Sequence, residues 1–107
     1  MNFQENLAAM PDINHLSGLD VTDAEGKVLH QIPASPGKLG SLKLYNALAQ
    51  QFHGTLNAEA ARQGLAWFAE HVADAQNHPG KHPNIDLLFR VQAQNLELKL
   101  LPIGADQ

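Results

Sequence analysis

The sequence contains no cysteine. This absence excludes disulfides, thiolate nucleophiles and metal sites built on thiolates. There is also no run of about 18 apolar residues, so the sequence predicts no membrane-spanning helix. The first residues, Met1 to Asn6, lack the basic start and the apolar core of a secretory signal. We therefore expect a cytoplasmic protein with no membrane partner.

Basic residues are few and scattered. The chain has 7 Lys and Arg residues against 11 Asp and Glu, and its formal net charge is -4. No two of the basic residues are adjacent. A protein that binds nucleic acid needs a basic patch to neutralise phosphates, so we expect no nucleic-acid partner.

Length and composition predict one globular domain, residues 1–107. The chain is long enough to bury a hydrophobic core and too short for two domains. Apolar residues make up 44% of it and charged residues 17%, which is typical of a folded protein rather than a disordered one.

The first half of the chain predicts a helix, a β-hairpin and a second helix. Residues 2–10 carry a short apolar stripe at helical spacing. Residues 19–32 alternate between apolar and polar around a turn that contains Gly26, which predicts a hairpin. Residues 39–53 again have an apolar helical face, followed by Gly54 where a helix-ending glycine is expected.

The second half predicts a helix followed by a second hairpin. Residues 58–76 have a helical apolar stripe, and residues 77–84 form a loop. The apolar run 85–91 and the alternating run 96–100 predict two strands joined by a tight turn. The order α-β-β-α-α-β-β indicates an α+β fold: an antiparallel sheet built from two hairpins flanking a central helix pair, with helices mainly on one face.

Histidines and acids cluster at the end of the long second-half helix. On a continuous helix His71, Asp74 and His78 fall at i, i+3 and i+7, hence on roughly one face, and His82 follows. Imidazole and carboxylate groups suit a divalent metal such as zinc. However, Pro79 pushes His78 out of the helical conformation, and the short zinc signatures are absent. We predict no resident metal and no cofactor, and keep a metal or ligand site as the alternative.

The loop after this helix is a candidate ligand-binding loop. His78, Lys81 and His82 present two imidazoles and an ammonium group, which suit an anionic ligand or an acidic partner. A rigid connection between two elements explains the same residues, because two prolines restrict the backbone there.

A second candidate site lies at the start of the helix at 39–53. Gly37 and Gly40 let backbone N–H groups approach an anion, and Lys38 adds a charge near Ser41. The nucleotide-binding pattern G-x-x-x-x-G-K-[ST] is not met, so nucleotide hydrolysis is not predicted. An ordinary helix cap by Ser41 or Ser35 is the alternative interpretation.

Apolar residues exceed what one buried face requires. Trp67 and Phe68 adjoin on one predicted helix, and the run Leu87–Phe89 on a strand must point to both faces of the sheet. We therefore expect an apolar patch on one side of the sheet, covered either by another element or by a second chain, and homodimerisation is a natural solution.

Four segments of the chain resemble a family of small bacterial proteins of unknown function. They are Gly18–His30, Gly37–Asn46, Gly64–His71 and Pro79–Asp86. The resemblance covers nearly the whole chain. It implies a bacterial protein, and it implies no activity and no site.

Two hypotheses about function follow. The first is a non-enzymatic, self-associating module that binds a protein or a small molecule. The second is a small-ligand or divalent-metal site, with or without catalysis, that uses His71, Asp74, His78, Lys81 and His82.

Overall fold

The computed structural model describes residues 1–105, which form an α+β fold of helices packed on a sheet. None of the helices in this range is long and apolar enough to cross a bilayer. The elements, in chain order, are α1 (Phe3–Ala8), β1 (Leu16–Thr22), β2 (Val28–Pro33), α2 (Leu39–Gln51), β3 (Thr55–Leu56), α3 (Ala58–Phe68), α4 (His71–Asn77), α5 (Pro83–Gln94) and β4 (Leu98–Gly104).

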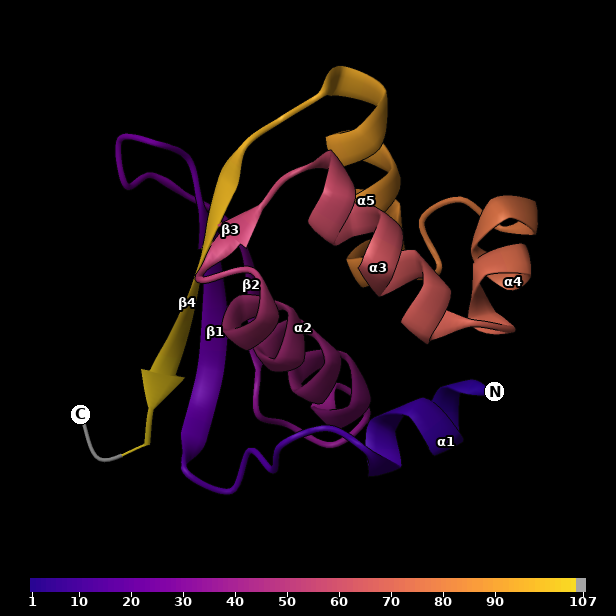
Figure 1. The fold of residues 1–107 in the computed structure, drawn as a ribbon, viewed down its shortest axis with the longest axis horizontal. Coiled ribbons are helices and arrows are strands. Elements are labelled where there is room, and N and C mark those ends of the chain that lie inside the picture. Colours follow the sequence, from indigo (N-terminus) through magenta and orange to yellow (C-terminus); the bar gives the residue numbers. More distant parts are fainter. Residues whose placement is uncertain (106–107) are drawn as a thin grey trace.

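The sheet is antiparallel and has the strand order β2-β1-β4-β3. The last strand of the chain, β4, therefore lies between β1 and β3. The helices gather on one side of the sheet (Figure 1). The α+β class, the antiparallel sheet and the helices on one face are thus confirmed.

Alternation along β1 decides which face of the sheet is buried. Val21 is paired with Leu100 on β4 and is fully buried, as is Leu19 opposite Ile32. Asp20, between them, points to the other face, where its carboxylate accepts a hydrogen bond of 3.1 Å from the Gln31 amide. The period of two therefore places the apolar side chains under the helices.

The turn of the first hairpin is held by one carboxylate. Asp23 Oδ1 accepts hydrogen bonds of 2.9 Å from the backbone N–H groups of both Glu25 and Lys27. Gly26 has a φ of +88°, a conformation that glycine adopts without steric cost. The predicted hairpin is confirmed, and its turn residues explain why the chain reverses there.

The core lies between the sheet and helices α2, α3 and α5. Leu48 of α2 and Leu88 of α5 are fully buried and meet at Gly64 of α3. A Cβ atom at Gly64 would lie 2.8 Å from Leu88 Cδ1 and 3.0 Å from Leu48 Cδ1. The glycine therefore permits the close approach of three helices.

The strand predicted over residues 85–91 is wrong, because this segment belongs to helix α5. Its buried residues Ile85, Leu88 and Val91 recur at helical spacing, whereas Arg90 is exposed. Pro83 stands in the first turn, where its missing N–H costs nothing, and the helix ends at a left-handed Asn95. The second predicted hairpin is therefore a helix followed by the single strand β4.

The continuous helix predicted over residues 58–76 is also wrong. It breaks at Ala69, whose φ is +53°, and α4 continues in a new direction. Contacts with α1 fix the break: Asn6 Nδ2 donates to the carbonyl of Trp67 at 3.0 Å, and the N–H of Phe3 donates to Glu70 Oε1 at 2.8 Å. Packing of α1 thus overrides a local helical preference.

Candidate functional site

The two candidate sites of the sequence meet at one cavity of about 180 Å³. It lies between the beginning of α2, the α3–α4 turn and the beginning of α5. The polar or backbone groups that line it come from both predicted sites: Gly37, Lys38, Ser41, His71, Lys81 and His82. Gly40 does not line it, and neither do Asp74 and His78. The structure therefore joins most of two residue groups that are about 40 positions apart in the chain.

Asp74 fixes the loop that carries Lys81 and His82. Its Oδ2 atom lies 2.6 Å from His82 Nε2 and 3.0 Å from Lys81 Nζ. His78 Nε2 is farther away, at 3.7 Å from Oδ1, and the His78 side chain is 61% exposed. The hydrogen bonds from His82, and next from Lys81, lower the pKa of Asp74 from 3.8 to about 2. Asp74 is thus an anchor behind the cavity wall.

His71 lies on an apolar wall of the cavity rather than beside Asp74. Its ring meets that of Phe3 edge-on, with centroids 4.8 Å apart, and Phe3 stacks on Phe68 at 5.5 Å. The ring of His82 is 6.1 Å from that of His71. His71 and Asp74 both belong to α4, and His78 follows at its C-cap. The imidazoles that border the cavity are those of His71 and His82.

The cluster does not fit a metal site. Within residues 1–105, no three side chains of the His, Cys, Asp or Glu types are placed to hold a metal ion. Asp74, the carboxylate nearest the imidazoles, already accepts hydrogen bonds from His82 and Lys81. Helix α4 ends at Asn77, and Pro79 follows the C-cap His78, so the helical spacing does not extend to His82.

The beginning of α2 has no serine cap. Lys38 occupies the N-cap position and makes no side-chain capping hydrogen bond. The carbonyl of Ser35 accepts from the Lys38 N–H at 2.9 Å, and Ser41 lies inside the helix. The interpretation of Ser41 or Ser35 as an ordinary N-cap is therefore wrong, and the first N–H groups of this helix receive no side-chain acceptor.

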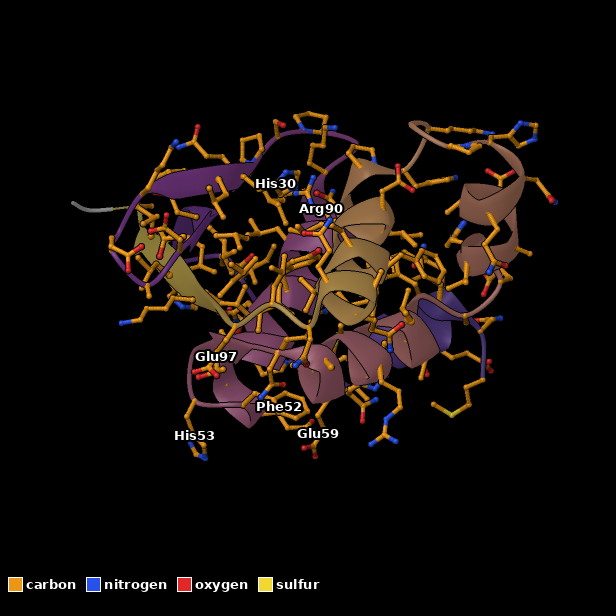
Figure 2. The ribbon with its side chains drawn as sticks, turned by 90° about the horizontal axis from the view of Figure 1, so that it is seen from above. His30, Phe52, His53, Glu59, Arg90 and Glu97 are labelled. Atoms are coloured by element: carbon orange, nitrogen blue, oxygen red, sulfur yellow. The ribbon has the colours of Figure 1, made fainter. Side chains whose placement is uncertain are left out.

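A buried polar link that the sequence did not indicate supports the cavity from behind. The Tyr45 hydroxyl donates to the carbonyl of Asn84 at 2.6 Å, and His30 Nε2 lies 2.6 Å from Asn84 Oδ1. Burial raises the pKa of Tyr45 above its ordinary value. His30 of β2 and Arg90 of α5 lie on the same side of the domain (Figure 2). Because Asn84 also lines the cavity, the link connects α2, β2 and α5 at this wall.

The chain belongs to the family DUF2322, described as "Uncharacterized protein conserved in bacteria", whose sequence profile matches residues 3–102. The predicted resemblance to a bacterial family of unknown function is confirmed. Comparisons with curated proteins and with solved structures gave no match.

Proposed function

We propose that this DUF2322 protein is a binding module for a small anion, held in the cavity between α2 and the loop of Lys81 and His82. The observation that carries the proposal is the composition of the cavity wall. It contains two lysines and two histidines and no Asp or Glu side chain, in a protein whose net charge is -4.

The position of each cation supports this function. Lys38 makes no ion pair within residues 1–105, so its ammonium group is free to meet a ligand. Lys81 is held at the cavity by Asp74, which fixes its direction without neutralising the whole site. The uncapped N–H groups of α2 add a favourable dipole at the same wall.

The floor of the cavity limits the size of the ligand. Phe3, Phe68 and Ile85 are buried and close it from below. A volume of about 180 Å³ suits an anion of few atoms, such as inorganic phosphate or a small carboxylate.

Inorganic phosphate is the direct probe. In a ¹H–¹⁵N NMR titration we expect shifts concentrated at the amides of residues 37–41 and 80–84. Lys38→Met should weaken binding about tenfold, as expected for the loss of a charge-assisted contact. Lys99→Met, on the sheet, is the matched control and should leave the affinity unchanged. The proposal would be contradicted if phosphate caused no amide shifts, or if the shifts were spread over the protein rather than concentrated at this cavity.

Self-association is a second candidate function, favoured by a different observation. The reason taken from the sequence fails, because Leu87 and Leu88 are buried inside the domain. However, no helix within residues 1–105 covers the outer face of the sheet, where Leu29 and Leu101 are 42% and 45% exposed. Sedimentation velocity at several concentrations tests this candidate, with Leu101→Glu as the disrupting variant. A monomer at every concentration would contradict it.

A further inference from the structure

Helix α1 separates the cavity of the proposed anion site from a second, larger cavity. Phe3 lines the first cavity, and Leu7, one turn later, lines the second. Both rest on Gly40, where an added Cβ would lie 3.1 Å from Phe3 Cζ and 3.3 Å from Leu7 Cδ1. The second cavity measures about 500 Å³ and shares no lining residue with the first.

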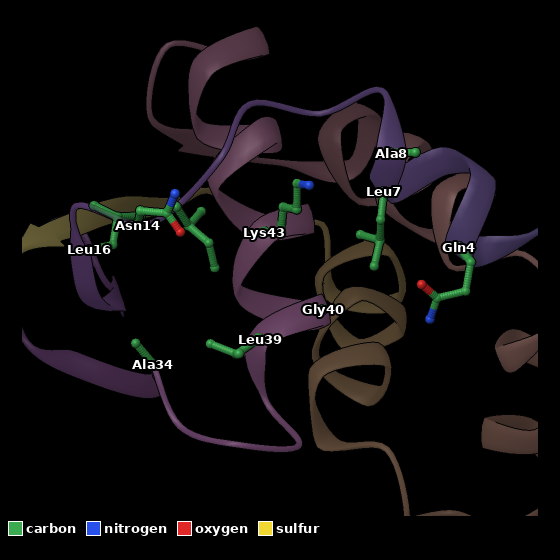
Figure 3. Close-up of a pocket in the computed structure, with 10 residues that line it drawn as sticks. Gln4, Leu7, Ala8, Asn14, Leu16, Ala34, Leu39, Gly40 and Lys43 are labelled. Atoms are coloured by element: carbon green, nitrogen blue, oxygen red, sulfur yellow. The ribbon is translucent and has the colours of Figure 1, made fainter.

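The second cavity is apolar along most of its length. It is lined by Leu7 of α1, Ile13 between α1 and β1, Leu16 of β1 and Leu39 of α2. Leu39 is 48% exposed although it borders a concave surface. Figure 3 shows its side chain directed away from α2 toward Leu16 and Ala34. An apolar chain in this space would remove the leucine from water, which is favourable in proportion to the area covered.

One end of the cavity is polar and cationic. Lys43 extends from α2 into the space between Asn14 and Leu7 (Figure 3). It makes no ion pair in the described part of the chain, and neither Asp nor Glu lines the cavity. Gln4 and Asn14 are the other polar residues that line the cavity. An ammonium group beside an apolar slot is complementary to a ligand with a carboxylate head and a hydrocarbon body.

We propose that this cavity binds an unbranched medium-chain carboxylate, with its carboxylate on Lys43 and its chain over Leu39 and Ile13. The volume of about 500 Å³ is in the range of small-ligand sites. The site is independent of the proposed anion function, because the two cavities share no lysine and no histidine.

Octanoate is the probe, with 1-octanol, acetate and phosphate as matched comparisons. In a ¹H–¹⁵N NMR titration of the full chain, octanoate should shift the amides of residues 4–8, 13–16 and 39–43. Acetate lacks the chain and 1-octanol lacks the charge, so each should bind more weakly than octanoate. Phosphate should not displace octanoate, whether or not phosphate binds at the other cavity. This competition therefore distinguishes a failure of the present proposal from a failure of the anion function proposed above.

Two variants separate recognition of the charge from recognition of the chain. Lys43→Met should weaken octanoate binding about tenfold and leave 1-octanol binding unchanged, with Lys99→Met as the neutral control. Leu39→Ser should weaken both ligands, and its partial exposure makes it compatible with folding. The absence of octanoate shifts at the named residues in the wild-type protein would overturn the proposal. Equal loss of octanoate and 1-octanol in Lys43→Met would overturn the assignment of the carboxylate to Lys43.

Discussion

Helices α2 and α5 meet at Gly64 of α3 through fully buried leucines, whereas α4 buries one residue and holds the loop after it through a partly exposed carboxylate. Leu48 and Leu88 of the first region are fully buried, and a hydroxyl of α2 reaches the backbone of α5. In α4 only Ala75 is buried, and the side chain of its anchor Asp74 is 37% exposed. One region therefore carries the stability of the fold, and the other positions the loop of the proposed site.

The difference between the two regions indicates where the structure opens most easily. A segment with few buried apolar contacts opens locally at a lower free energy than the core does. In this molecule that segment is α4, whose Asp74 holds Lys81 and His82. Four substitutions test this division between the two regions.

Leu88→Ala should have the largest effect. It removes a fully buried side chain that packs against Gly64, so the free energy of unfolding should fall by about 2–5 kcal/mol. Urea denaturation followed by circular dichroism measures the loss. Leu101→Ala, on the exposed face of the sheet, is the control and should cost less than about 1 kcal/mol. Similar losses for the two variants would show that α5 does not carry the core.

Tyr45→Phe should have the next largest effect. The substitution keeps the ring but leaves the buried carbonyl of Asn84 without its donor at 2.6 Å. The expected loss is about 1–3 kcal/mol, measured by urea denaturation. The amide resonances of α5 near Asn84 should shift in NMR spectra, whereas those of α4 should not. Unchanged stability would mean that the link between the helices contributes nothing net.

Ala69→Gly should stabilise the protein by about 1 kcal/mol. Ala69 has a φ of +53°, a strained conformation for a residue with a Cβ, and glycine relieves that strain. The gain is reduced by the greater freedom of glycine in the unfolded chain. Ala66→Gly, inside α3, is the matched control and should destabilise by about 1 kcal/mol. Thermal and urea denaturation of both variants check the opposite signs.

Asp74→Asn should have the smallest effect, and the effect should depend on pH. Its pKa is lowered in the folded state, so the ionised carboxylate stabilises the fold above about pH 4, the ordinary range of an aspartate. This stabilisation is lost as the pH falls through about 2. The stability of Asp74→Asn should therefore lie below that of the wild type at neutral pH and converge with it in acid.

Urea titrations at several pH values measure this convergence. Glu25→Gln, on the exposed hairpin turn, is the control. It makes the same change of charge but does not remove a carboxylate that holds a loop. A gap between Asp74→Asn and wild type that stays constant down to pH 2 would assign the effect to packing rather than to ionisation.

Local patterns predicted the first half of the fold well. The turn residues Asp23 and Gly26 and the alternation of β1 act over short distances, so they are readable without the rest of the chain. The strand predicted at 85–91 is wrong because a short apolar run fits either a buried strand or a buried helix. Pro83 and Asn95, at the two ends of α5, were the local signals that favour a helix.

The site was predictable in its parts and not in its assembly. The composition of residues 37–41 and of residues 71–82 indicates each candidate site. Their convergence on one cavity depends on the packing of α1, α2 and α5. The break at Ala69 has no glycine or proline to signal it, since it is fixed by contacts from Asn6 and Phe3 far away in the sequence. The second cavity has no sequence motif at all, because apolar residues around it also have the spacing of a core.

The place of β4 in the sheet sets the order in which the protein can fold as it leaves the ribosome. Residues 98–104 are synthesised after all the helices that the structure describes in residues 1–105, yet they form the strand that joins β1 to β3. The hairpin of β1 and β2 can form early, since its contacts are local. The sheet cannot close until β4 has left the ribosome. The apolar faces of α2 and α3 therefore stay partly exposed to water during elongation. A nascent chain stalled before Leu98 would lack the strand that joins β1 to β3.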